Sequence, residues 1–174
     1  AYIPTNVISI TDGQIFLESS LFFSGMRPAV NVGLSVSRVG GDAQTKAMKK
    51  AAGSLRIDLA QYREMEVFTQ FSSDLDDATK EQLEYGSGLM ELLKQPLGKP
   101  MSLADKVITL CAARHKVMLG IPTAKVKGFQ MDMLSYFASA HPEIAREIEE
   151  TKDLSKELSQ KIVEIAEEFK KSRC

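Results

Sequence analysis

The segment best suited to phosphate chemistry is residues 33–41, where Arg38 stands as the single charged residue among mostly small ones. A guanidinium is always charged and offers a planar fork of donors that matches the oxygens of a phosphate. Small neighbours also let another surface approach the arginine closely. Spacing alone still favours a structural arginine that caps the next helix or pairs with an acid, because such arginines are common. Arg27-Pro28 is a second such place, with a stronger case for a structural role.

Most enzyme signatures are absent from the sequence. It has no P-loop pattern, no Gly-x-Gly-x-x-Gly string and no His-Glu-x-x-His string. The two histidines, His115 and His141, lack partners at metal-ligand spacing, so they are interpreted as structural or surface residues. The two cysteines, Cys111 and Cys174, are too far apart to define a zinc site or a disulfide framework. We therefore expect no metal site.

The charge balance excludes some classes of partner. The chain of 174 residues carries 22 Lys and Arg against 23 Asp and Glu, a formal net charge of -1. Such a balance gives no electrostatic argument for nucleic acid or an anionic membrane. No apolar run approaches the roughly 20 residues of a membrane helix, and the first residues lack the pattern of a signal peptide. A small basic group is interpreted as a solvated helix face rather than a nucleic-acid site, namely Lys46, Lys49, Lys50 and Arg56.

The character of the sequence changes near residue 42, and the part before it predicts β-strands. Residues 7–10 and 14–17 are rich in β-branched and apolar side chains, and an Asp-Gly pair between them suits a tight hairpin turn. Residues 29–32 are a third candidate strand. About forty residues of this kind cannot bury a core alone. We therefore interpret residues 1–42 as the β-rich C-terminal edge of a larger α/β nucleotide-binding domain, a partial segment by itself.

After residue 42 the apolar residues recur at helical spacing, so residues 43–174 predict a bundle of five or six helices and a mainly α chain. Asp76 and Ser102 are suitable N-caps for two of these helices. Proline and glycine mark several ends, and the last helix carries an amphipathic stripe. The expected helices run from 43 to about 71, from 76 to the break at 96–100, from 102 to 120, from 124 to 140, from 142 onward and through 154–169.

Several strings of the sequence resemble the alpha subunit of F-type ATP synthases. The match is dense through about residue 101 and continues beyond it mainly as a helical pattern. The strings are long and specific, and they lie at residues 2–15, 27–40, 59–64, 73–76 and 92–95, with Phe71 between them. The sequence is therefore identified as a member of this family that corresponds to the C-terminal portion of the alpha subunit.

The resemblance implies a role at an interface between subunits. In this family, alpha and beta subunits alternate in a hexameric head around a central stalk that contains gamma, and the catalytic ATP sites lie mostly on beta. Alpha is the non-catalytic, regulatory subunit and contributes an arginine finger, which maps onto Arg38. Ser9 and Ser35 match positions near the same catalytic interface. A finger delivered in trans stabilises charge on the transferring phosphoryl group, generally worth ~10³–10⁵ in rate.

The resemblance also implies a non-catalytic nucleotide site on alpha. Arg27, Pro28 and Gln95 match positions that line its adenine pocket, and Leu97 stands where some members have glutamine. ATP or ADP with Mg²⁺ is expected in the intact complex. The family's P-loop lies upstream of these residues. We therefore expect no cofactor for this chain by itself, and no ATP hydrolysis by it.

The implied setting is proton-driven ATP synthesis or hydrolysis by a peripheral membrane complex. Such a complex faces the bacterial cytoplasm, the mitochondrial matrix or the chloroplast stroma, and alpha meets the membrane only through it. One alternative is a stand-alone helical interaction module without catalytic linkage, and another is the regulatory subunit of vacuolar-type ATPases. Residues 1–42 argue against the module, which has no use for a finger-bearing edge. The strings around Arg38 and at 59–64 favour the F-type alpha subunit.

Overall fold

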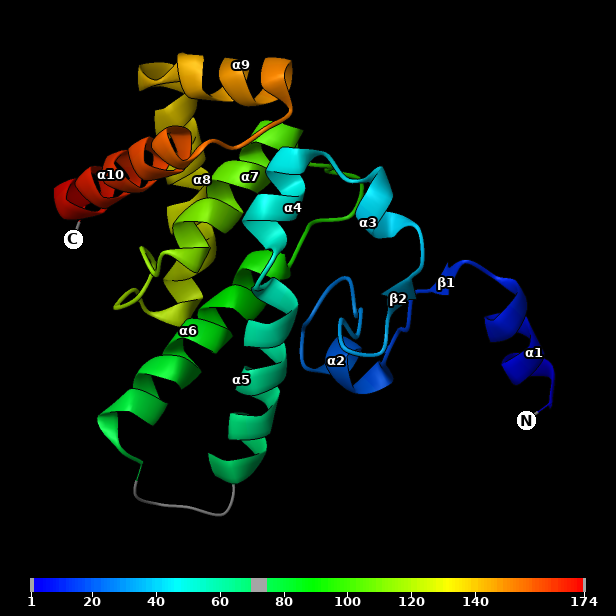
Figure 1. The fold of residues 1–174 in the computed structure, drawn as a ribbon. Helices are drawn as coiled ribbons and strands as arrows, with labels where there is room; N and C mark the ends of the chain where they lie inside the picture. Colours follow the sequence, from blue (N-terminus) through cyan, green and yellow to red (C-terminus); the bar gives the residue numbers. More distant parts are fainter. Residues whose placement is uncertain (1, 70–74, 174) are drawn as a thin grey trace.

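The computed structural model describes residues 2–69 and 75–173, which form a helical bundle with an N-terminal segment beside it (Figure 1). The prediction of a mainly α fold is confirmed. Within the described residues the bundle contains seven helices, α4 to α10. Their bounds are Lys46–Ala52 for α4, Leu55–Thr69 for α5, Asp77–Leu93 for α6, Leu103–Arg114 for α7, Thr123–Ala140 for α8, Pro142–Thr151 for α9 and Lys156–Arg173 for α10.

Helix α7 lies at the centre of the bundle, because it packs against α4, α8, α9 and α10. Its residues Val107 and Ile108 are almost completely buried. Helix α10 covers one side with the stripe that its sequence pattern predicts, formed by Leu158, Ile162, Ile165 and Phe169. Removal of apolar surface from water is the main favourable term in folding, so this core holds the bundle together.

Helices α5 and α6 pack against each other and extend away from the rest of the bundle, at the bottom of Figure 1. Helix α6 also packs against α8, which ties the pair to the core. The C-terminal end of α6 is closed by Lys127 of α8, whose Nζ donates to the carbonyl oxygens of Leu92 and Lys94 at 3.3 and 2.5 Å. Burial lowers the pKa of Lys127 from its ordinary value. The start of α5 lies next to the N-terminal segment.

Both N-caps predicted from the sequence are confirmed. The Asp76 carboxylate accepts a hydrogen bond from the backbone N–H of Thr79 at 3.1 Å, and the Ser102 hydroxyl accepts one from Asp105 at 3.0 Å. Each bond satisfies a backbone donor that has no partner within the first turn of its helix. These local bonds fix where α6 and α7 begin.

Replacing Ser102 by alanine is expected to lower the free energy of unfolding by about 1 kcal/mol, because the first turn of α7 loses its cap. The measurement is urea denaturation of the chain followed by circular dichroism. Ser139, whose hydroxyl donates to the carbonyl of Tyr136 near the end of α8, provides a matched control. An equal loss of stability in the Ser139→Ala variant would show that the effect is not specific to the cap.

The strand predicted for residues 7–10 is wrong. These residues lie in helix α1, Tyr2–Ile10, so the hairpin expected between them and residues 14–17 does not form. A helix closes its hydrogen bonds within one segment, whereas a strand needs a neighbour at a matching register. The residues that were expected to supply that neighbour pair with a different part of the chain.

The β-structure of the described residues is short and pairs segments distant in sequence. Strand β1, Gly13–Gln14, runs antiparallel to β2, Val36–Ser37. An isolated bridge joins Leu17 and Val30, so the second and third predicted strands do meet, but at one position. Helices α2, Ser19–Phe23, and α3, Gly40–Ala43, complete this segment. As described, this segment is therefore a folded-back stretch of chain whose sheet has two strands of two residues each.

The single helix predicted from residue 43 to about residue 71 is also wrong, because it is broken in the middle. Helix α4 ends before Gly53, and α5 begins two residues later. Glycine weakens a helix interior, which accounts for the end of α4 at this position. The expected end near residue 71 lies outside the described residues. The break is one reason why seven helices occur where five or six were expected.

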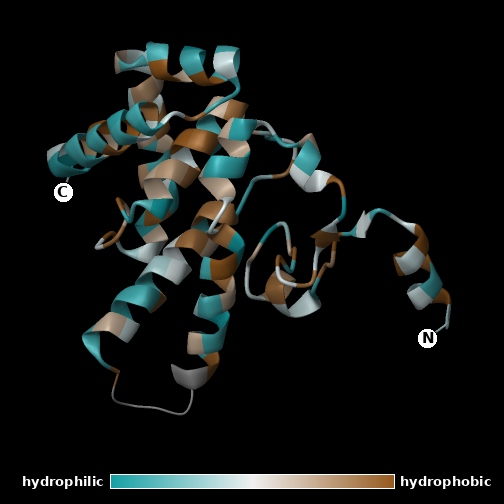
Figure 2. Cartoon of the chain, in the orientation of Figure 1, coloured by the Kyte–Doolittle hydropathy of each residue, from teal (hydrophilic) through white to brown (hydrophobic). Residues whose placement is uncertain are grey.

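Hydrophobic residues of the N-terminal segment remain on the outside of this chain. Figure 2 shows them along α1 and α2 and the loops between, away from the bundle core. The most exposed large apolar side chains include Tyr2, Ile10, Ile15 and Phe23.

The domain boundary near residue 42 stays a prediction. None of the helices in the described residues has the length and apolar character needed to cross a membrane.

Candidate functional site

Arg38 follows β2 directly, and its side chain is exposed. Its backbone N–H donates to the carbonyl oxygen of Asp12 at 2.8 Å, which fixes the main chain at this point. Within residues 2–69 and 75–173 its guanidinium forms no hydrogen bond or ion pair, and α3 begins without a side-chain cap. Within the described part of the chain, Arg38 thus neither caps the following helix nor pairs with an acidic residue, which were the two structural roles that the sequence left open. The guanidinium is free to meet a group from outside this chain.

The loop that leads to Arg38 is organised by Asn31, which is only 6% exposed. Its backbone N–H donates to Phe16 at 2.8 Å, and its Nδ2 donates to Oε1 of Glu18 at 2.6 Å. Its Oδ1 accepts from the backbone N–H of Leu34 at 3.0 Å. A buried amide with all its groups paired specifies one geometry, because each unpaired group costs free energy. Residues 31–35, defined here as the finger loop, are therefore held in one shape.

Two arginines of α5 tie the finger loop to the bundle. Nη1 of Arg63 donates to Oδ1 of Asn31 at 2.8 Å, and Nη2 of Arg56 donates to the carbonyl oxygen of Gly33 at 2.9 Å. The sequence analysis did not identify Asn31, Arg56 or Arg63 as site residues. The available signals were that Arg63 falls in the string at 59–64 and Asn31 in the string at 27–40.

Ser35 belongs to the same network. Its Oγ donates to the carbonyl oxygen of Asn31 at 2.6 Å and accepts from the backbone N–H of Phe16 at 2.9 Å. Ser35 therefore supports the finger loop three residues before Arg38. Ser9 lies in the last turn of α1, where its Oγ donates to the carbonyl oxygen of Asn6 at 2.8 Å. Among the described residues no hydrogen bond joins Ser9 to Ser35 or Arg38.

The three residues expected around adenine do come together. Arg27, Pro28 and Gln95 line one open pocket of about 670 Å³, and the other lining residues are Phe22, Ala29, Pro96, Leu97 and Gly98. Pockets of this volume accommodate small-molecule ligands. The pocket joins the N-terminal segment to the loop after α6, because the backbone N–H of Gln95 donates to the carbonyl oxygen of Arg27 at 2.9 Å.

The chemistry of this pocket suits a flat, partly apolar ring. The guanidinium carbon of Arg27 lies 4.6 Å from the ring centroid of Phe22, a cation–π arrangement. Nε2 of Gln95 donates to the carbonyl oxygen of Lys99 at 2.9 Å. That bond fixes the side-chain amide, and within residues 2–69 and 75–173 its oxygen accepts no hydrogen bond. Leu97, where some family members have glutamine, adds apolar surface to the rim.

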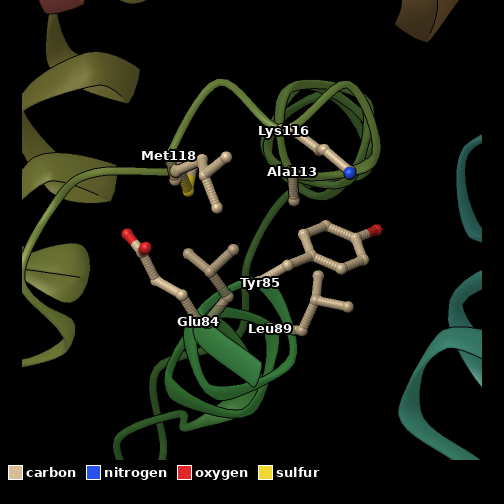
Figure 3. A pocket seen from close by; sticks show the side chains of 9 residues that line it. Glu84, Tyr85, Leu89, Ala113, Lys116 and Met118 are labelled. Atoms are coloured by element: carbon tan, nitrogen blue, oxygen red, sulfur yellow. The ribbon is translucent and has the colours of Figure 1, made fainter. Parts of the chain in front are cut away.

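A second hollow between α6 and the end of α7 is too small for such a ligand. Figure 3 shows it between Glu84, Tyr85 and Leu89 of α6 and Ala113, Lys116 and Met118 on the facing side. Its volume is about 20 Å³, which is room for roughly one water molecule. We regard it as a packing feature. The described residues also contain no group of three or more acidic, histidine or cysteine side chains that could hold a metal ion.

Comparison with known proteins identifies the family. The model described as "ATP synthase alpha/beta chain, C terminal domain" matches residues 44–169, and the model for the "ATP synthase alpha/beta family, nucleotide-binding domain" matches residues 1–37. The chain therefore belongs to the ATP synthase alpha/beta family. The resemblance that its sequence strings carry is confirmed.

Several curated proteins that are similar to this chain are alpha subunits. The chain is 57% identical over 171 residues to ATP synthase subunit alpha of Clostridium kluyveri, and 57% identical over 170 residues to that of Acetivibrio thermocellus. It is 54% identical over 169 residues to that of Petrotoga mobilis. These matches cover 97–98% of this chain and 34% of each relative. The chain thus spans about a third of the length of the relatives that it matches.

Proposed function

We propose that this chain is part of the non-catalytic, regulatory alpha subunit of an F-type ATP synthase, and that it supplies Arg38 as an arginine finger to the ATP site of a neighbouring beta subunit. In this proposal the subunit serves proton-driven ATP synthesis and hydrolysis in a hexamer of alternating alpha and beta subunits around gamma. The complex is a peripheral membrane assembly. Nucleic acid has no part in it.

The observation that carries the proposal is the state of Arg38. Its guanidinium is exposed and has no partner in the described part of the chain, while its backbone is fixed through Asp12. An arginine finger needs this combination, because it must reach a phosphoryl group on another subunit from a fixed position. Ser35 supports the same loop through the hydrogen bond from its hydroxyl to the carbonyl oxygen of Asn31. An arginine with a structural task would be engaged within its own chain.

The pocket around Arg27, Pro28 and Gln95 supports a second part of the proposal, a non-catalytic site that receives the base of ATP or ADP. The pocket is apolar at its rim, and the side-chain oxygen of Gln95 accepts no hydrogen bond within the described part of the chain. The exocyclic amine of adenine is a suitable donor for that oxygen. The phosphates and Mg²⁺ would be held by parts of the subunit that precede these residues.

ATP binding by this chain alone is expected to be weaker than micromolar, because the pocket offers contacts to a base but no loop that cradles phosphates. Isothermal calorimetry of the chain against MgATP is the measurement, with the complete subunit as the positive control. Micromolar affinity of the isolated chain would contradict the division of the nucleotide site that is proposed here.

The test of the finger is the Arg38→Lys variant of the complete alpha subunit, assembled with beta and gamma. Multisite ATP turnover is measured beside nucleotide binding at the beta sites. Loss of turnover with retained binding supports the proposal, because lysine keeps the charge and loses the planar fork. Unchanged turnover would reduce Arg38 to a surface residue and favour the alternative of a stand-alone helical interaction module.

A further inference from the structure

One buried acceptor, Oδ1 of Asn31, links the finger loop both to itself and to the bundle. Oδ1 of Asn31 receives the N–H of Leu34, from inside the loop, and Nη1 of Arg63, from α5. The two donors lie 3.0 and 2.8 Å from this oxygen. A charged donor in a partly buried place forms one of the stronger kinds of hydrogen bond. The position of the loop is therefore set by α5 as well as by the N-terminal segment.

Gly33 shows how closely Arg63 approaches the loop. A Cβ atom at this residue would lie 3.3 Å from Oδ1 of Asn31 and 3.6 Å from Nη1 of Arg63. The backbone of Gly33 is not in the left-handed region, so an added Cβ would meet a tight contact with Asn31 and no backbone strain. The carbonyl oxygen of the same residue receives Arg56, also from α5. Arg56 and Arg63 are seven residues apart on one face of α5, and they contact the loop at two points, the carbonyl oxygen of Gly33 and the side chain of Asn31.

We propose that Arg63 is a positioning residue for the finger: it holds the loop through Asn31 so that Arg38 points to the neighbouring ATP site. This inference rests on the function proposed above and adds a positioning residue from the bundle to that site. Arg63 is half-buried and bonded to its own chain, so it does not touch the reacting atoms. Its effect passes through residues 31–38.

The geometry predicts the size of the effect. Removal of the Arg63 side chain leaves β1, β2 and the Glu18 contact in place, so the loop stays folded but is less precisely aimed. A misplacement of about 1 Å in a catalytic group lowers the rate by up to roughly 10²-fold. We therefore expect the Arg63→Met variant to lower kcat about tenfold to a hundredfold. Loss of the finger itself should cost more.

The experiment uses the complete alpha subunit assembled with beta and gamma, and it compares Arg63→Met, Arg38→Lys and the double variant. The Arg63→Met variant should lower kcat per assembled complex, with nucleotide affinity unchanged, and should cause no further loss in the Arg38→Lys background. Arg63→Lys should retain more activity than Arg63→Met because it keeps one donor. Arg146→Met, at an exposed arginine of α9, is the matched control and should retain full activity.

The outcomes separate this inference from the proposed function. If Arg38→Lys loses turnover and Arg63→Met keeps full kcat, the inference fails and the finger stands. The inference also fails if Arg63→Met lowers kcat by the same factor with Arg38 intact or replaced. If Arg63→Met does not assemble, Gly33→Ala takes its place, since the added methyl presses on the same contact. Full kcat in that assembled variant overturns the inference.

Discussion

Replacement of Arg38 by lysine in the complete alpha subunit is expected to lower multisite ATP turnover by about 10³-fold or more, with little change in nucleotide affinity. A guanidinium can contact two oxygens of the transferring group at once, whereas an ammonium acts as a point charge on a flexible four-carbon stem. The missing contact develops mainly in the transition state. Its loss therefore appears in kcat rather than in binding.

The measurement is steady-state hydrolysis by the purified assembly, together with nucleotide titration of the same preparation. Arg146→Lys provides the matched control, because Arg146 is exposed on α9 and has no contact assigned to it in the described part of the chain. It should leave both quantities unchanged. An Arg38→Lys assembly with normal kcat contradicts the finger, and one with lost affinity and normal kcat assigns Arg38 to ground-state binding.

A chemical rescue sharpens this test. Arg38→Ala removes the side chain but leaves the backbone bond to Asp12 and the Asn31 network, so the space beside the phosphoryl group should persist. Free guanidinium at low concentration is then expected to restore part of the turnover of this variant. The wild type is the control, since guanidinium should not accelerate it. Absence of rescue together with normal assembly would point to a role for Arg38 other than contact with phosphate.

The largest effect on stability is expected at Gly86, where α6 meets α5. A Cβ atom at this residue would lie 2.3 Å from Cδ2 of Tyr62 and 2.5 Å from its Cβ. The second distance shows that rotation of the ring cannot relieve the clash, so the two helices must separate. Overpacking of this kind costs about 1–3 kcal/mol. Gly86→Ala is therefore expected to destabilise the chain, although alanine is the better helix former.

Tyr62 is also restrained at its other end. Its hydroxyl donates to Oε1 of Glu66 at 3.2 Å. Burial, and then the neighbouring Glu66 carboxylate, raise the pKa of Tyr62 to about 12, so the hydroxyl keeps its proton at neutral pH. Movement of the ring away from an added methyl would break this bond. The clash at Gly86 therefore cannot be removed without further loss.

Gly88 provides a matched control in the same helix. Nothing lies within 4 Å of a Cβ atom built at that position. Gly88→Ala is expected to be neutral or to stabilise the chain by up to about 1 kcal/mol through helix propensity. Urea denaturation of both variants measures the difference. Equal stabilities for Gly86→Ala and Gly88→Ala would mean that α5 and α6 do not pack as closely as described.

Much of the bundle could be predicted from sequence because its signals are local. Asp76 and Ser102 cap the helices that follow them, and each bond spans three residues. The stripe on α10 repeats every three to four residues and is buried as expected. The N-terminal segment was predicted less well. Residues 7–10 have the composition of a strand, but strand formation depends on a partner elsewhere in the chain.

The candidate site was also predicted only in part from the sequence. The resemblance indicated Arg38, Ser35 and Ser9 as catalytic-interface residues and Arg27, Pro28 and Gln95 as nucleotide contacts, and their roles stay predictions. The structure adds that the last three line one pocket, and that Ser35 supports the loop before Arg38. Neither fact follows from spacing.

The sequence by itself determined the mainly α class, the two N-caps and the membership in the ATP synthase alpha/beta family. These depend on contacts within a few residues, or on strings long enough to be specific. Only the tertiary structure decided that Arg63 meets Asn31 and that Gln95 meets Arg27. Such pairs are separated by tens of residues, and they are set by how α5 and the end of α6 pack beside the N-terminal segment, because a long-range contact exists only once the elements that carry it are in place.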